Sequence, residues 1–278
     1  MSLRCGSRQL DLSSPKIMGI LNTTPDSFSD GGALYTDGAL NISAALTRAE
    51  QMVLEGASII DVGGESTRPG AATVSIQEEL DRVVKIVEII SSRLDVIISV
   101  DTSKPQVMDA CAAAGAGFIN DVRALQWPGA LDAASRLDLP ICLMHKQGEP
   151  GDMQLNPSYH HVEREVRDFF YDCIDKCRSK GISPLRLLFD PGFGFGKTDE
   201  HNIRLMNALP ELAQVGCPLL VGLSRKSMIG RLLGRDVADR LPGSLAFGLV
   251  ALQRGAAILR VHDVAATRDI IKVYELTC

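Results

Sequence analysis

The stretch that decides the fold is Leu219-Leu220-Val221-Gly222-Leu223-Ser224-Arg225-Lys226-Ser227, an apolar run that ends in hydroxyl-bearing and basic side chains. Seven further runs of this kind occur along the chain, and each is followed by residues able to bind or react. The eight runs cover residues 17–21, 59–62, 96–100, 118–120, 141–144, 187–189, 219–223 and 258–261. Most are continuously apolar, which is typical of parallel strands buried on both faces.

Helical periodicity fills the intervals between these runs. In one interval Ile42, Ala45, Leu46, Ala49 and Val53 follow a single helical face. Eight alternations of strand and helix predict an α/β fold, a (β/α)8 TIM barrel, for which 278 residues are sufficient. A doubly wound, flavodoxin-like sheet is the structural alternative, but eight units favour closure. Without a linker, we expect a single domain over residues 1–278, with an N-terminal extension over residues 1–15.

Composition excludes several classes of protein. The formal net charge is −5 and no basic run dominates, which argues against nucleic-acid binding. No apolar run approaches the roughly 20 residues needed to span a bilayer, and no secretory signal is visible. Seven cysteines without CxxC pairs do not indicate a disulfide framework, so we expect a cytoplasmic protein. Cys173 and Cys177 have chelating spacing but fit an apolar helix face better than a metal site.

The polar residues that follow the runs are expected to meet, because TIM-barrel active sites lie at the C-terminal ends of the strands. Asp101 alone is explained equally well as a helix N-cap, and His145 alone is better explained as a structural histidine. Five polar residues follow five different runs, namely Asp101, Asn120, Asp190, Lys226 and Arg260. Burying them together without a partner is costly, so we expect a polar ligand to complete the set.

The chemistry of this set indicates the kind of ligand. Two carboxylates and an amide beside a lysine suit a flat heterocycle with ring N–H and exocyclic NH₂ groups. Arg68, Arg260 and His262 form a cationic group suited to a phosphate or diphosphate. Gly196-Lys197-Thr198 resembles the end of a phosphate-binding P-loop, but Pro191 stands where that motif needs glycine. We therefore set aside a nucleoside triphosphatase.

Two loop sequences resemble those of a known family. GILNTTPDSFSDGG at residues 19–32 and DVGGESTRPG at residues 61–70 look like the signature loops of the dihydropteroate synthases. The blocks after the later runs match that family in type and order, and the resemblance extends from about Lys16 to the C-terminus. It implies a pterin-binding barrel of folate biosynthesis. Such enzymes join para-aminobenzoate to 6-hydroxymethyl-7,8-dihydropterin diphosphate and release pyrophosphate and 7,8-dihydropteroate.

The resemblance implies a role for each residue of the pterin site. Asp190 would bind the amino and ring N–H groups of the pterin, with Asn120 and Asp101 on the opposite edge. Lys226 would reach the oxo group, and the planar guanidinium of Arg260 would lie against the ring face. Among these residues, Asp101, Lys226 and Arg260 are the expected catalytic residues.

The resemblance also implies sites for the diphosphate and for the second substrate. Asn22 would contact the Mg²⁺ that the diphosphate carries. The diphosphate itself would contact Thr67, Arg68 and His262. The para-aminobenzoate site would consist of Phe28, Pro69, Phe195 and Ser227, with help from the helix that begins near Lys226. Phe28 and Phe195 are alternatively ordinary loop anchors.

We expect a dissociative displacement in which loss of pyrophosphate is the difficult step. Mg²⁺, Arg68 and His262 would stabilise the leaving group, and Asp101 would offset positive charge on the pterin. The loops after the first two runs would close over the second substrate.

Two other functions remain open: a pterin-dependent methyltransferase and a pterin-binding protein that has lost catalysis. By resemblance we further expect a homodimer and competition between sulfonamides and para-aminobenzoate. One departure from the family is Lys146-Gln147-Gly148 after His145, where an apolar residue is common. It concerns the packing of that loop.

Overall fold

Eight parallel strands close into a barrel in the computed structural model, which describes residues 1–24, 35–36, 39–66, 73–149 and 151–277. Around the barrel the strands follow the order β10-β11-β12-β3-β6-β7-β8-β9. Their bounds are β3 (Lys16–Asn22), β6 (Ile59–Gly63), β7 (Ile97–Asp101), β8 (Phe118–Asp121), β9 (Ile141–Met144), β10 (Leu187–Asp190), β11 (Leu219–Val221) and β12 (Ala256–Val261). The predicted (β/α)8 TIM barrel is confirmed, and the open doubly wound sheet is wrong.

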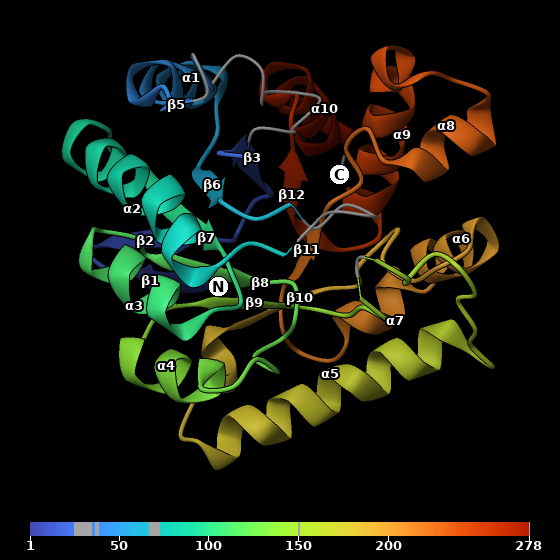
Figure 1. Cartoon of the computed structure of the whole chain (residues 1–278). Coiled ribbons are helices and arrows are strands. Elements are labelled where there is room, and N and C mark those ends of the chain that lie inside the picture. The colour runs from blue at the N-terminus through green and yellow to red at the C-terminus, as the bar shows by residue number, and fades with distance from the viewer. Residues whose placement is uncertain (25–34, 37–38, 67–72, 150, 278) are drawn as a thin grey trace.

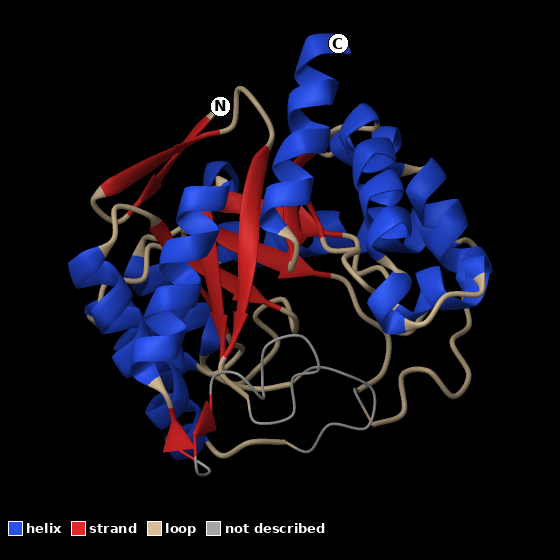
Figure 2. Ribbon diagram, turned by 90° about the horizontal axis from the view of Figure 1, so that it is seen from above, coloured by secondary structure: helices blue, strands red, loops and turns tan. Residues whose placement is uncertain are grey.

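Helices surround the strands, as Figures 1 and 2 show from two directions. The α-helices are α1 (Ile42–Glu55), α2 (Ile76–Arg93), α3 (Pro105–Ala113), α4 (Ala130–Leu137), α5 (Val162–Ser179), α6 (Asp199–Asn207), α7 (Leu209–Ala213), α8 (Ser227–Leu233), α9 (Leu241–Gln253) and α10 (Val264–Thr277). Short elements connect them: β4 (Tyr35–Thr36), β5 (Ala39–Leu40) and the 3₁₀ turns η1 (Pro184–Arg186) and η2 (Val237–Asp239). Helix α1 has clear ends: Asn41 Oδ1 accepts the N–H of Ala44 at 2.9 Å, and Gly56 is left-handed with φ +111°.

The N-terminal extension covers one end of the barrel. It forms an antiparallel hairpin of β1 (Ser2–Cys5) and β2 (Arg8–Asp11). The buried side chains of this hairpin belong to the same apolar cluster as Phe118 and other residues of the barrel interior. The hairpin lies so close to the barrel that a Cβ on Gly117 would come within 2.6 Å of the Cys5 carbonyl oxygen.

Side chains along each barrel strand alternate between two cores. On β6, Ile59 belongs to the interior cluster, whereas Ile60 packs in the cluster between strands and helices. Because strand side chains have a period of two, Asp61 faces the interior like Ile59. By the same reasoning Asp101 follows Ile97 on β7 into the interior. An apolar inner layer is therefore succeeded by a polar one toward the C-terminal ends of the strands.

The helices and the cysteines of the described part of the chain each have one further property. None of its helices combines the length and apolar character that crossing a membrane requires. The cysteines at positions 5, 111, 142, 173, 177 and 217 are buried and free.

Candidate active site

A layer of charged and amide side chains lies inside the barrel at the C-terminal ends of its strands. Asp61 Oδ2 accepts hydrogen bonds from Arg260 Nε at 2.6 Å and from Asn120 Nδ2 at 3.1 Å. The NH2 group of Arg260 donates to Asp101 Oδ2 at 2.8 Å. These charge-assisted bonds link four strands, β6, β7, β8 and β12, around one guanidinium.

Burial perturbs the charges of this layer. It raises the pKa of Asp101 to about 8, although Arg260 opposes the rise and Asp61 adds to it. Burial alone would lower the pKa of Arg260, but Asp61 and Asp101 together raise it, so the guanidinium stays charged. Asp61 Oδ1 is buried and has no hydrogen-bond partner among the described residues. Such an acceptor costs about 1–3 kcal/mol, and a ligand N–H would satisfy it.

Asp190 and Lys226 form a second charged group beside the first. Asp190 Oδ1 accepts the N–H of Gly192 at 2.7 Å. Burial raises the pKa of Asp190, and Lys226 partly offsets this. Burial likewise lowers the pKa of Lys226 to about 8, against the effect of Asp190. Lys226 Nζ donates to the carbonyl of Phe193 and lies 4.7 Å from the centre of the Phe195 ring.

Gly222 keeps the space between the two charged groups open. A Cβ at this position would lie 3.9 Å from Asp190 Oδ2 and 3.8 Å from Arg260 Cβ. Asp190 and Arg260 therefore lie on either side of a residue without a side chain, which allows a ligand close to the backbone. The arrangement offers hydrogen-bond acceptors and donors around one opening.

Asn22 lies at the end of β3, beside Gly63 of β6. A Cβ on Gly63 would lie 3.9 Å from Asn22 Oδ1 and 3.8 Å from Asp101 Oδ2. An amide oxygen and a carboxylate oxygen thus flank the same vacant side-chain position. In the described ranges, no group of three or more His, Cys, Asp or Glu side chains is arranged to hold a metal ion.

The ends of β11 and β12 are tied together at the rim of the barrel. His262 Nδ1 lies 3.0 Å from Ser224 Oγ, and the His262 backbone N–H donates to the same oxygen at 3.2 Å. Arg225 Nε donates to Asp263 Oδ2 at 2.8 Å. This ion pair supports the left-handed backbone of Arg225, whose φ of +57° is uncommon for a residue other than glycine. The two contacts fix the segment that presents Lys226 next to the one that presents His262.

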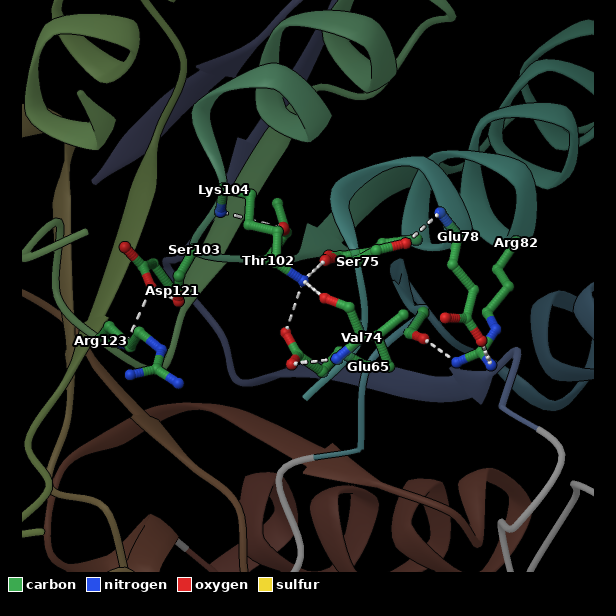
Figure 3. Close-up of polar contacts among 12 residues, drawn as sticks. Glu65, Val74, Ser75, Glu78, Arg82, Thr102, Ser103, Lys104, Asp121 and Arg123 are labelled. Atoms are coloured by element: carbon green, nitrogen blue, oxygen red, sulfur yellow. Dashed lines mark hydrogen bonds and ion pairs between the residues drawn. The ribbon is translucent and has the colours of Figure 1, made fainter. Parts of the chain in front are cut away.

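A buried charge cluster holds the residues that follow β6 and β7, as Figure 3 shows. Lys104 Nζ donates to Glu79 Oε2 at 2.5 Å, Glu65 Oε2 at 3.0 Å and the Val74 carbonyl at 2.8 Å. Lys104 is 3% exposed and Glu79 is fully buried. Because Lys104 comes three residues after Asp101, the cluster restrains the chain where it leaves the polar layer.

The structure brings together the five polar residues predicted from the strand ends, Asp101, Asn120, Asp190, Lys226 and Arg260. Phe195 is half-buried beside Lys226, and Ser227 is exposed at the start of α8. Asn22 and His262 lie at the ends of their strands. Four predicted residues lie outside the described residues: Phe28, Thr67, Arg68 and Pro69.

Asp61 is the member of the layer to which sequence reasoning assigned no role. It stands inside an apolar run rather than after it, so a search restricted to strand ends passes over it. The signal in the sequence that could identify Asp61 is a carboxylate two positions after Ile59, in a strand buried on both faces. Such a charge needs a buried partner, which here is Arg260.

Comparison with known proteins places the chain in a family. The family described as "Pterin binding enzyme" matches residues 18–262. Dihydropteroate synthase of Haemophilus influenzae is 52% identical over 277 residues, covering 100% of this chain and 99% of the relative.

Two solved structures extend the comparison to the fold. A Yersinia pestis dihydropteroate synthase with a sulfonamide drug complex has a TM-score of 0.95 at 51% identity, covering 100% of this chain and 99% of the other. A Xanthomonas albilineans dihydropteroate synthase in complex with 7,8-dihydropteroate has a TM-score of 0.88 at 45% identity, covering 100% and 98%. The chain therefore belongs to the dihydropteroate synthase family of pterin-binding enzymes.

Proposed function

We propose that this chain is a transferase that condenses 6-hydroxymethyl-7,8-dihydropterin diphosphate with para-aminobenzoate to give 7,8-dihydropteroate and pyrophosphate. The observation that carries the proposal is the polar layer around Arg260, inside the barrel of a member of this family. The bound 7,8-dihydropteroate of the Xanthomonas relative supports the same product for this chain.

The polar layer suits the hydrogen-bonding edges of a pterin. Asp190 would accept from the amino and ring N–H groups, with Asn120 and Asp101 on the opposite edge. Lys226 would donate to the oxo group, since an ammonium has three donors and the carbonyl of Phe193 takes one of them. Arg260 would lie against the ring face, held there by its bonds to the two carboxylates at 2.6 and 2.8 Å.

Asp61 gives this proposal an independent support. Its Oδ1 atom is a buried acceptor without a donor among the described residues. A heterocycle that carries several N–H groups supplies what this atom lacks, whereas an apolar ligand would leave it unsatisfied.

We propose that Mg²⁺ arrives with the diphosphate and that Asn22 is a protein ligand to it. The donor set fits this use: Asn22 offers one neutral oxygen at the vacant position over Gly63, and Mg²⁺ prefers oxygen ligands from phosphates and water. When bound, the ion would stabilise negative charge on the departing pyrophosphate. Thr67, Arg68 and His262 would contact the same group, and His262 is held toward it by Ser224.

The second substrate would lie where Lys226 and Phe195 meet. The half-buried Phe195 ring and the Lys226 side chain 4.7 Å from its centre offer a surface for the aromatic ring, and the start of α8 would help to bind the carboxylate. Ser227 begins α8 next to Lys226 and is exposed, so its hydroxyl is accessible to that carboxylate. Phe28 and Pro69 would complete the site.

The chemistry then requires little covalent help from the protein. The bond between the pterin methylene carbon and the diphosphate oxygen breaks, and its electron pair leaves with pyrophosphate. The neutral arylamine nitrogen attacks the resulting carbon centre and loses a proton. Asp101 would offset the positive charge that develops on the reduced pterin in those molecules in which its carboxyl is ionised, a fraction that grows as pH approaches its pKa of about 8.

The test is pyrophosphate release by the purified protein with both substrates and Mg²⁺, each omitted in turn. We expect release only when both substrates and Mg²⁺ are present, with dihydropteroate as the organic product. Pterin binding without release would instead support a non-catalytic pterin-binding protein. Methyl transfer from a methylated folate, without use of para-aminobenzoate, would support a methyltransferase.

We further propose that the chain works as a single-domain protein, forms a homodimer and acts in the cytoplasm. The family membership supports these proposals. Light scattering at micromolar concentration tests the oligomeric state, since a monomer mass would exclude the homodimer.

A further inference from the structure

Lys197 is a buried lysine to which the proposed chemistry gives no role. It is 1% exposed, and within the described residues its ammonium forms no ion pair with a carboxylate. It donates to the carbonyls of Gly192 at 2.9 Å, Phe195 at 3.2 Å and His145 at 3.4 Å. The fourth contact, at 3.0 Å, is to Nδ1 of the same histidine.

The electrostatics show that Lys197 is retained at an energetic cost. Burial lowers the pKa of Lys197 to about 7, and Asp190 opposes the change. Burial and the nearby ammonium both lower the pKa of His145, so its ring is neutral, and Nδ1 accepts from Lys197 while the lysine carries its proton. An apolar residue would avoid the desolvation of a charge but would leave these acceptors without a donor.

The acceptors show which parts of the chain Lys197 joins. Gly192 and Phe195 belong to the connection between β10 and α6, and His145 directly follows β9. The two segments are in close contact, because a Cβ on Gly192 would lie 1.8 Å from the His145 carbonyl oxygen. The His145 N–H also donates to the carbonyl of Asp190 at 2.9 Å. The ammonium thus fixes the β10–α6 connection from inside and holds it against β9.

The same connection also contacts Lys226. The carbonyl of Phe193, between the two carbonyls that bind Lys197, accepts from Lys226. The ring of Phe195, whose own carbonyl binds Lys197, lies against the Lys226 ammonium. Two lysines therefore determine how residues 192–195 are presented, and Lys197 does so without reaching the opening of the barrel.

We infer that Lys197 is a positioning residue for the second substrate: it fixes the backbone of Phe195 so that the ring and Lys226 form the surface that binds an aromatic amine carrying a carboxylate. The inference rests on the proposed function, in which Phe195 contacts para-aminobenzoate. It also gives a role to the Gly196-Lys197 sequence that fails as a P-loop, because this lysine binds carbonyls of its own loop rather than a phosphate.

The test is steady-state kinetics of Lys197→Met, a variant of similar volume that lacks the donors. We expect KM for para-aminobenzoate to rise about tenfold, while KM for the dihydropterin diphosphate stays within about twofold. A merely structural role would lower the folded fraction and so the apparent kcat, and would leave both KM values unchanged. Lys146→Met is the matched control: its ammonium binds Gly148 and Glu149 of the neighbouring loop, and its kinetics should not change.

A double-mutant cycle with Phe195→Ala provides the second readout. If Lys197 acts through this ring, Lys197→Met adds little to the KM for para-aminobenzoate once the ring is gone. If the methionine variant does not fold, Lys197→Gln, which keeps an amide donor, replaces it in the same measurements of KM. An unchanged KM for para-aminobenzoate, equal rises in both KM values or an additive cycle would overturn the inference. Turnover of the unsubstituted protein, measured alongside, tests the proposed function separately.

Discussion

Arg260 Nε lies 2.6 Å from Asp61 Oδ2, in a contact between two strands that are 199 positions apart in the chain. Asp61 is fully buried, and the same oxygen also accepts from Asn120 at 3.1 Å. This pair organises the polar layer, because Arg260 also binds Asp101 and would lie against the pterin ring. Substitutions at Asp61 and Asp101 should therefore affect both stability and activity.

Asp61→Ala should destabilise the fold and reduce activity together. Removing one partner of a buried ion pair costs about 3–5 kcal/mol when the other charge is left alone, and we expect the lower end of this range because Arg260 keeps its bond to Asp101. Urea unfolding measures the change in free energy. Asp109→Asn is the control, because its ion pair with Arg136 is exposed and worth less than about 1 kcal/mol. Equal, small effects of the two substitutions would contradict a central role for Asp61.

Asp101→Asn should reduce kcat much more than it raises KM for either substrate. The amide preserves shape and hydrogen bonding but cannot offset a positive charge that develops only in the transition state. Steady-state kinetics with each substrate varied measures the two effects. Parallel losses in substrate binding and kcat would show that Asp101 only binds the pterin.

The same substitution should change how stability depends on pH. The pKa of Asp101 is raised from 3.8 to about 8 in the folded protein, so the folded state retains this proton where the unfolded state loses it. The contribution to stability is therefore full below about pH 4 and is lost as pH rises to about 8. Relative to Asp101→Asn, the unsubstituted protein should lose unfolding free energy over this range. A constant difference in urea unfolding from pH 4 to 9 would exclude the raised pKa.

Much of the polar layer was predictable because strand ends in a barrel share one edge. Asp101, Asn120, Asp190, Lys226 and Arg260 each follow an apolar run, so fold class and spacing were sufficient to group them. Asp61 was missed because its role depends on two facts that the sequence does not show. Its side chain points into the barrel, and Arg260 becomes its neighbour only when β12 pairs with β3 and β3 with β6.

Residues that bind only backbone or other buried charges were harder to predict. Lys197 looked like part of a nucleotide motif, but it binds carbonyls of its own loop and His145, which comes next to that loop when β9 and β10 pair. The N-terminal extension gave no sign that it would cover the barrel, since its few apolar residues form no long run. The contact of Lys197 with His145 and the position of the N-terminal extension both depend on packing between segments that are far apart in the sequence.

Lys104→Met should destabilise the protein strongly. The substitution would leave Glu79, which is fully buried, without its cation, and the expected loss is about 3–5 kcal/mol. Glu78→Gln is the matched control on the same helix, because it removes only a surface ion pair with Arg82, shown in Figure 3, and should cost less than about 1 kcal/mol. Urea unfolding measures both losses. Equally small losses for the two variants would show that the buried cluster does not stabilise the fold.

The most direct measurement is the affinity of the purified protein for dihydropterin diphosphate by calorimetry, compared between the unsubstituted chain and Asp190→Asn. Replacing the carboxylate removes an acceptor for the pterin N–H groups, and we expect Kd to rise at least about a hundredfold. Asp199→Asn, in the following helix, should leave Kd unchanged, because the partner of Asp199 among the described residues is Arg231. An affinity of Asp190→Asn within about twofold of the unsubstituted protein would contradict the assignment of the polar layer as the pterin site.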